Sequence, residues 1–175
     1  SFGSDEIYLE KFIENPRHIE VQVIADNHGN ALHFFERDCS VQRKNQKIIE
    51  EAPAWNLDKS KKEELFELCL NCLKKMKYKG VGTFEFLYKD SEFYFIEMNT
   101  RLQVEHTVTE MITNIDLVKL QIETAAGEKL SIKQKDIKKY GHAIECRINA
   151  EDPETFIPSP GKVTEYDPPG GIGVR

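Results

Sequence analysis

Two glutamates in successive strand patterns have the spacing of a metal site. Glu85 and Glu97 flank a short polar connection, and if the turn centres on Ser91 they face each other across a hairpin. Like charges directly opposite each other in a sheet repel, and a carboxylate among aromatic side chains is costly unless it is compensated. A divalent cation between them would resolve both problems, and Asn99 adds a hard oxygen ligand of the kind that suits magnesium. The spacing alone fits two solvated glutamates on an exposed sheet face equally well.

Polar side chains alternate directly after Glu97. Asn99, Arg101, Gln103 and Glu105 occupy every second position, so an extended segment would point them to the same side as Glu97. Such a row could hold a planar oxyanion, because arginine offers a fork of donors and Glu105 could act as a base. A solvated edge strand is the alternative interpretation.

A basic stretch at residues 37–47 has no clear periodicity, and we expect a loop there. Near a metal and nucleotide site, its cations and amides would suit a polyanion. By itself the pattern fits a charged surface equally well. The cations are Arg37, Arg43, Lys44 and Lys47.

The strands that must position these groups follow from alternation and turn signals. Residues 19–23 alternate between apolar and polar types, which predicts a half-buried strand. Residues 26–30 predict a hairpin turn, and residues 31–36 a returning strand. Further strand patterns cover residues 81–88, 93–98 and 142–149, and the proline-rich tail after residue 150 predicts loops.

Two helices are expected between these strands. The first begins where Ser60 and Glu63 have capping-box spacing, and its apolar stripe comprises Leu65, Leu68, Cys69, Cys72, Leu73 and Met76. The second runs from Asp116, a natural N-cap, to Gly127. Strands and helices without regular alternation predict an α+β fold.

Composition excludes several classes of function. The formal net charge of −6 argues against a nucleic-acid partner, because a phosphate backbone needs a basic face. The sequence has no apolar run long enough for a membrane helix, so we expect no membrane partner. Cys69 and Cys72 form a C-x-x-C pair, but both lie on the apolar stripe without a second zinc-spaced pair. We therefore interpret them as small core residues in a reducing compartment rather than as a zinc or redox site.

Several segments, taken in order, resemble one family. Residues 95–106 read Phe-Ile-Glu-Met-Asn-Thr-Arg-Leu-Gln-Val-Glu-His, and residues 145–153 read Glu-Cys-Arg-Ile-Asn-Ala-Glu-Asp-Pro. With segments 10–18, 36–43, 46–53 and 82–86, they closely resemble biotin carboxylase, over nearly the whole chain. That family belongs to the ATP-grasp enzymes, which hold nucleotide between two α+β lobes. The resemblance implies an ATP-grasp carboxyl-terminal lobe at residues 1–132, then the start of the biotin carboxylase carboxyl-terminal domain at 133–175, cut off at both ends.

The resemblance also implies roles for individual residues. Those that match the adenine hinge strand are Glu10, Lys11 and Ile13, and those that match the rest of the nucleotide site are His18, Gln42 and Asn45. Asn45 is a departure, since many relatives have histidine there. The magnesium or manganese ligands correspond to Glu85 and Glu97, with Asn99 beside them.

The remaining matches concern the anion and biotin. The bicarbonate site corresponds to Lys47, Arg101, Gln103, Val104 (through its backbone) and Glu105. Glu105 resembles the base that deprotonates bicarbonate, and Arg147 resembles the residue that stabilises the biotin enolate. The glycine-rich phosphate loop and two upstream ATP-binding lysines of the family have no counterpart, so we expect this chain alone to be inactive.

By resemblance, the parent enzyme uses MgATP and bicarbonate to carboxylate biotin on a carrier protein, through carboxyphosphate. The expected partners are the biotinylated carrier, a carboxyltransferase component and a second copy of the enzyme. The expected location is the cytoplasm, or an organelle in a eukaryote. The carboxylase served could be the acetyl-CoA enzyme of fatty acid biosynthesis or another acyl-CoA or pyruvate carboxylase. The alternatives are another ATP-grasp ligase, such as a carbamoyl-phosphate synthetase, and a non-enzymatic fragment.

Overall fold

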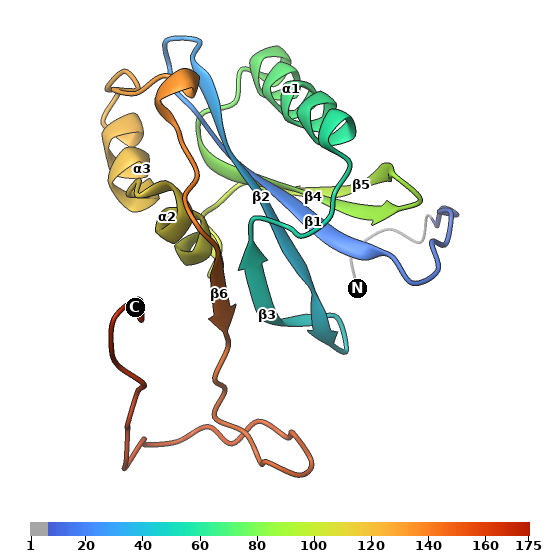
Figure 1. The fold of residues 1–175 in the computed structure, drawn as a ribbon, viewed down its shortest axis with the longest axis vertical. Coiled ribbons are helices and arrows are strands. Elements are labelled where there is room, and N and C mark those ends of the chain that lie inside the picture. Colours follow the sequence, from blue (N-terminus) through green and yellow to red (C-terminus); the bar gives the residue numbers. More distant parts are fainter. Residues whose placement is uncertain (1–6) are drawn as a thin grey trace.

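One antiparallel sheet organises the structure, a computed structural model that describes residues 7–175 (Figure 1). Within that range the strands follow the order β5-β4-β1-β2-β3-β6. They are β1 (Arg17–Ala25), β2 (Ala31–Arg43), β3 (Gln46–Ala52), β4 (Gly80–Lys89), β5 (Glu92–Asn99) and β6 (Ala143–Cys146). The helices are α1 (Lys59–Met76), α2 (His106–Thr113), α3 (Leu117–Ala125) and the short 3-10 helix η1 (Gln134–Asp136). The predicted α+β class is confirmed.

Helix α1 covers one face of the sheet. Its N-cap is Asp58, whose carboxylate accepts a hydrogen bond from the Lys61 amide at 2.9 Å, so the capping box predicted at Ser60 and Glu63 is wrong. The helix ends at Met76, because Lys77 adopts a left-handed conformation with φ 51°. The apolar stripe is only partly as predicted, since Leu68 and Met76 are more than half exposed. The residues that do pack against the sheet are Leu65, Phe66, Cys69 and Leu73.

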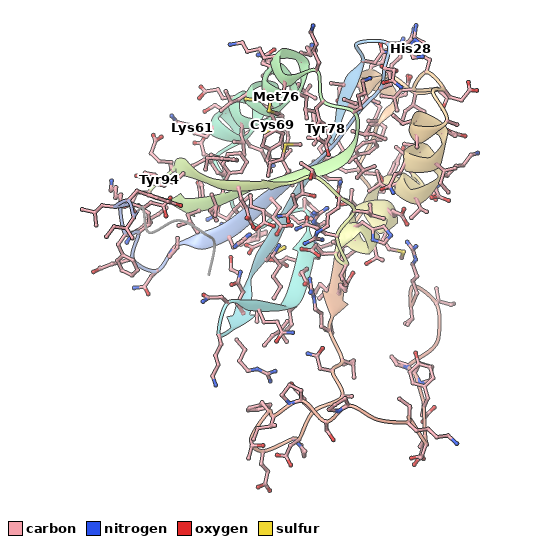
Figure 2. All side chains as sticks on the ribbon, turned by 180° about the vertical axis from the view of Figure 1, so that it is seen from behind. His28, Lys61, Cys69, Met76, Tyr78 and Tyr94 are labelled. Carbon is pink, nitrogen blue, oxygen red and sulfur yellow. The ribbon has the colours of Figure 1, made fainter. Side chains whose placement is uncertain are left out.

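The cysteine pair on α1 behaves as core. Cys69 is buried between the helix and the sheet (Figure 2), and Cys72 packs at the edge of the same cluster. Both thiols are free. Burial raises the pKa of Cys69, which keeps its thiol uncharged and unreactive. The interpretation of this pair as small hydrophobic residues is confirmed.

Helices α2 and α3 lie on the opposite side of the sheet from α1 (Figure 1). α3 begins at the predicted N-cap, Asp116, which accepts from the Lys119 amide at 2.7 Å. Its buried residues Leu117 and Leu120 pack at one end of the sheet, in a cluster with the strand residues Ile24, Leu32, Phe34 and Val81. α2 was not predicted, because its run of eight residues is too short for a clear helical period.

The strand predicted as half-buried is buried on both faces. Every residue from Ile19 to Ala25 is buried, including Glu20 and Gln22, which are 0% exposed. The alternation therefore separates an apolar face under α1 from a polar face near α2. A strand can bury polar side chains only where partners satisfy them, so this face points to a buried polar network.

The basic stretch predicted as a loop is mostly strand. β2 continues to Arg43, and a two-residue turn leads directly into β3. In that turn Lys44 and Asn45 have φ values of 50° and 64°, and asparagine tolerates this left-handed conformation well. The alternation was obscured because this end of the sheet carries polar side chains where a core strand would carry apolar ones.

A bulge in β2 changes which residues share a face. The β1–β2 register passes from Val23↔His33 to Val21↔Glu36, and Phe35 within the gap has φ 66°. One extra residue reverses the alternation beyond it. As a result Arg37 lies opposite Glu20, on the polar face of the sheet.

The last strand and the tail complete the described chain. β6 is shorter than the predicted 142–149 and pairs with β3, with Ile49 opposite Cys146. Residues after 150 form loops, as predicted, apart from a single bridge between Glu151 and Pro158. The chain returns towards α2, where Arg175 pairs with Glu110 at 2.6 Å (Figure 1). None of the helices in residues 7–175 is both long and apolar enough to cross a membrane.

A buried histidine makes the stability of this fold depend on pH. The His33 ring stacks on Phe66 with centroids 4.2 Å apart, and burial lowers its pKa to about 4. The unfolded chain therefore binds the proton more readily, so stability is complete above about pH 6.5 and falls as the pH drops towards 4. We expect this residue to contribute a loss of about 2–3 kcal/mol over that range.

The test compares denaturant unfolding of wild type and His33→Phe between pH 4 and 7. The variant should lose less stability on acidification, because the apolar ring can still stack but binds no proton. His28→Gln, at an exposed turn, is the control and should follow the wild type. Identical pH profiles for wild type and His33→Phe would contradict the prediction.

Candidate active site

Most of the predicted site residues line one cleft of about 790 Å³. These are His18, Gln42, Asn45, Lys47, Glu85, Glu97, Asn99, Arg101, Gln103, Val104, Glu105 and Arg147. They come from five neighbouring strands (β1 to β5), from the turn between β2 and β3, from the segment between β5 and α2, and from the residue after β6. The sheet thus brings together groups up to 129 positions apart in the sequence (147 − 18).

The predicted hinge strand is the exception. Residues 7–13 form no strand, and Glu10, Lys11 and Ile13 do not line the cleft. The physical reason is that a strand needs a hydrogen-bonded neighbour, and this segment has none within the described residues. The apolar side chains of Leu9 and Phe12 are 101% and 83% exposed.

The facing glutamates of the hairpin are confirmed. Glu85 on β4 lies directly opposite Glu97 on β5. The turn consists of Asp90 and Ser91, and a register shift between Glu85 and Phe86 adds the one residue that aligns the two carboxylates. Glu85 is buried and Glu97 is exposed, so the pair lies at the edge of the cleft.

A third carboxylate, which the sequence did not suggest as a site residue, extends this row. Glu20 on β1 lies opposite Glu85 on one side and opposite Arg37 on the other. Four charged side chains thus cross the sheet in the order Glu97, Glu85, Glu20, Arg37. The signal for Glu20 was its place on the polar side of an otherwise apolar strand.

Lys47 is the cation at the centre of these carboxylates. Its Nζ donates to Glu20, to Glu85 at 3.0 Å and to Glu105 at 2.8 Å. Burial opposes the charge, but the carboxylates raise the pKa of Lys47 above its usual value. The ammonium therefore stays charged and offsets the repulsion within the cluster.

His18 joins the acidic row to the far wall of the cleft. Its Nε2 lies 2.8 Å from a Glu85 oxygen and 3.2 Å from a Glu20 oxygen, and its Nδ1 lies 3.1 Å from Nε2 of Gln42. Burial lowers the pKa of His18, but the two glutamates outweigh it and raise the pKa to about 9. In this arrangement His18 is a second cation beside Glu85.

Glu105 is flanked by two cations. It occupies the N-cap position of α2, but its side chain makes no capping hydrogen bond. Instead, Oε1 accepts from Lys47 and Oε2 accepts from Arg147 at 2.9 Å. Arg147 also donates to Glu50 at 2.6 Å. Its partners are therefore Glu50 and Glu105, and Glu50 is a further residue that the sequence did not suggest.

The segment after β5 does not continue as an extended row. β5 ends at Asn99 and the chain bends, so the alternation predicted through Glu105 is wrong. The bend still brings the side chains to the same cleft. Gln103 is 6% exposed and donates to Glu85 at 2.7 Å, whereas Arg101 is exposed and donates to Asn99 at 3.3 Å.

The donor set suits a hard divalent cation. Ligand atoms of His18, Glu20 and Glu85 all lie within 4.8 Å of one another, and Glu97 supplies another carboxylate beside them. Clustered carboxylate oxygens are the ligands that magnesium and manganese prefer. Asn99 presents its amide nitrogen to Glu85 at 2.7 Å, so its oxygen would face a metal only after the amide turns over.

Comparison with known proteins agrees with this geometry. The model of the carbamoyl-phosphate synthase L chain ATP-binding domain matches residues 1–133. The biotin carboxylase of Haemophilus influenzae is 59% identical over 175 residues, which are 100% of this chain and 39% of that protein. The chain thus spans about two fifths of the length of this relative.

Solved structures give the same result. A biotin carboxylase–beta-gamma-ATP complex from Campylobacter jejuni superposes with a TM-score of 0.90 at 57% identity, over 95% of this chain and 37% of that chain. The biotin carboxylase domain dimer of Hydrogenobacter thermophilus 2-oxoglutarate carboxylase, in complex with MgADP, ADP and bicarbonate, superposes with a TM-score of 0.90 at 53% identity. It covers 95% of this chain and 37% of that chain.

The family match and the superposed structures define the class of this chain as an ATP-binding domain. The chain belongs to the family of the carbamoyl-phosphate synthase L chain ATP-binding domain. Within that family its similarity, over the full length of the chain, is to biotin carboxylase, and the predicted resemblance is confirmed.

The cluster around Lys47 leads to a prediction about stability without metal. Lys47→Met leaves three carboxylates without their shared cation, and removal of one partner from a buried ion pair costs about 3–5 kcal/mol. We expect the midpoint of thermal unfolding in chelator to fall, by the equivalent of about 2–4 kcal/mol. Added manganese should restore part of the loss, because it can take the position between the carboxylates.

Lys61→Met is the matched control. Lys61 pairs with Glu92 at 3.2 Å on the surface, where an ion pair contributes less than about 1 kcal/mol. The melting temperature of Lys61→Met should stay close to that of the wild type and should not respond to manganese. Equal melting temperatures for Lys47→Met and wild type in chelator would show that Lys47 does not hold the cluster.

Proposed function

We propose that this chain is the part of a biotin carboxylase that holds the metal, the bicarbonate and the biotin enolate. The observation that carries the proposal is a single cleft in which Glu85 and Glu97 face each other beside Lys47, Glu105 and Arg147. The similarity to biotin carboxylases, one a complex with MgADP and bicarbonate, supports it. Another ATP-grasp ligase is not favoured, because the relatives and structures described above are biotin carboxylases or biotin carboxylase domains.

The first step of the proposed reaction forms carboxyphosphate. Lys47, Arg101 and Gln103, with the backbone of Val104, orient bicarbonate, which otherwise binds poorly. Glu105 takes the bicarbonate proton, and the oxygen so exposed attacks the terminal phosphate of ATP with release of ADP. Magnesium or manganese bound by Glu85 and Glu97, near Asn99, would supply positive charge to the phosphates.

The second step transfers the carboxyl group. Carboxyphosphate breaks down to carbon dioxide and phosphate, and phosphate takes the proton from the biotin ureido nitrogen. The resulting enolate attacks carbon dioxide. Arg147 offsets the charge that develops on the enolate oxygen, which is where electrostatic stabilisation raises the rate. Arg147 donates to Glu105 at 2.9 Å and lines the same cleft, which supports the proposal that both steps occur there.

The nucleotide contacts form the rest of the site. His18, Gln42 and Asn45 lie along the wall of the cleft and would contact the nucleotide. For Glu10, Lys11 and Ile13 the proposed adenine contact requires segment 7–13 to move onto the cleft. The proposed division is an ATP-grasp lobe at 1–132 and the start of the next domain at 133–175.

The wider assignment rests on the same relatives. We propose that the whole protein carboxylates biotin on a carrier protein and supplies a carboxyltransferase component, such as that of acetyl-CoA carboxylase in fatty acid biosynthesis. We also propose a homodimer, since the Hydrogenobacter thermophilus domain is a dimer. The proposed location is the cytoplasm, or an organelle in a eukaryote.

Arg147 provides the test of the proposed function. In a protein of full biotin carboxylase length that contains this chain, Arg147→Ala should slow biotin carboxylation at least about 100-fold, since one such donor contributes about 10²–10³ in rate. Bicarbonate-dependent ATP cleavage should fall far less. Parallel assays of ADP release and carboxybiotin formation measure both. Equal losses would indicate that Arg147 only pairs with Glu50 and Glu105, and would contradict its role at the enolate.

The chain by itself should not catalyse the reaction. Phosphoryl transfer depends on positive charge placed around the triphosphate, and magnesium on carboxylates keeps several water ligands, so it does not orient the phosphates alone. We expect ATP binding weaker than micromolar by calorimetry and no carboxylation of free biotin. Turnover above that of a Glu105→Gln control, or micromolar ATP affinity, would contradict this expectation.

A further inference from the structure

Arg37 is a fully buried cation beneath the cleft. It is the largest side chain with no solvent exposure, and it does not line the cleft itself. An arginine in such a place is costly unless charges and acceptors compensate it. Its role must therefore be sought in the groups that it holds.

All three nitrogens of the Arg37 guanidinium are engaged. Nε and NH2 donate to Oε2 of Glu20 at 3.3 and 3.0 Å. NH1 donates to Gln22 at 2.6 Å and to Thr109 at 3.1 Å. NH2 also reaches Thr83 at 3.3 Å and Gln103 at 3.2 Å. One side chain thus ties together β1, β4, the segment before α2, and α2 itself.

The contact with Gln103 fixes the orientation of its amide. An amide can present either oxygen or nitrogen, but a guanidinium only donates, so Gln103 must turn its oxygen to Arg37. Its nitrogen then faces the cleft wall and donates to Glu85 at 2.7 Å. That nitrogen carries two N–H groups, and among residues 7–175 Glu85 is its one protein acceptor. The other N–H is free for an anion.

The contact of Arg37 with Glu20 affects Lys47, another residue of the anion site. Arg37 holds Oε2 of Glu20, which leaves Oε1 to accept from Lys47. Arg37 therefore sets both Gln103 and the carboxylate that anchors Lys47. Gln103 and Lys47 line the same cleft as Glu105.

We propose that Arg37 is a positioning residue of the anion site: through Gln103 and Glu20 it holds the donors that bind bicarbonate, without touching bicarbonate itself. This inference rests on the proposed function for the identity of the anion. The positioning of Gln103 does not rest on it, and the two are tested separately.

The first test follows Gln103 in the 175-residue chain by nuclear magnetic resonance. The side-chain amide signals of Gln103 are assigned by their loss in Gln103→Ala. In Arg37→Lys they should move and broaden, because lysine keeps the charge but loses the planar fork of donors. Arg43→Lys is the control on the same strand. The Arg43 guanidinium does not line the cleft, and it donates to the Glu151 carboxylate at 2.9 and 2.6 Å. Unchanged Gln103 signals in Arg37→Lys would overturn the positioning role.

The second test uses enzyme kinetics in a protein of full biotin carboxylase length. Arg37→Lys should raise the KM for bicarbonate about tenfold, the equivalent of about 1.4 kcal/mol. The KM for ATP should stay within about twofold, and Arg43→Lys should change neither. In a Gln103→Ala background, Arg37→Lys should raise the KM for bicarbonate much less than tenfold, because the effects of two residues that act through each other are not additive. Equal increases in both KM values, or full additivity, would overturn the proposal.

A third variant tests the proposal in case Arg37→Lys does not fold. Thr109→Val removes one acceptor of Arg37 and keeps its charge and most of its contacts. It should raise the bicarbonate KM about twofold to fivefold with no change for ATP. No change in the bicarbonate KM would then overturn the proposal. A wild-type enzyme without biotin carboxylase activity, but with Gln103 signals that respond to Arg37→Lys, would refute the proposed function and leave the positioning role standing.

Discussion

The structure depends on the compensation of buried negative charge on one face of the sheet. Glu20, Glu85 and Glu105 converge there, and their mutual repulsion in a partly dry environment would separate the strands that carry them. Lys47 lies among all three and Arg37 supports Glu20 from below. The cluster is therefore stable only as a set. Lys47, which joins the three carboxylates, also lines the cleft, whereas Arg37 stays buried beneath it.

Because of this charge arrangement, the two faces of the sheet have different roles. The face under α1 is apolar and closed by Leu65, Phe66, Cys69 and Leu73, so it provides the burial that stabilises the fold. The other side is apolar under α3 and where Val108 and Ile112 of α2 pack on Ala52, and it carries buried polar side chains at the cleft. A flat polar patch would be solvated, but here the segment before α2 and Arg147 after β6 border it and make it a cleft. Rigid strands then hold the reactive groups at fixed distances, as a catalytic site requires.

Two irregularities in the strands place the charges. A bulge at Phe35 turns Arg37 to the polar face, and a register shift after Glu85 sets that residue opposite Glu97. Because side chains alternate with a period of two, a shift of one residue in either place would move a charge to the apolar side. The site is thus specified by departures from regular pairing rather than by the pairing alone.

The sequence by itself determined the family, the α+β class and the hairpin that pairs Glu85 with Glu97. These depend on local signals: contiguous motifs, turn residues and short-range alternation. Only the tertiary structure decided that Glu20, Arg37 and Glu50 support the site, that residues 37–43 are strand, and that residues 7–13 are not. The reason is physical. A contact such as Arg147 with Glu50 spans 97 positions, and a bulge shifts the alternation by one residue without a local signal, so these relations exist only once the sheet is assembled.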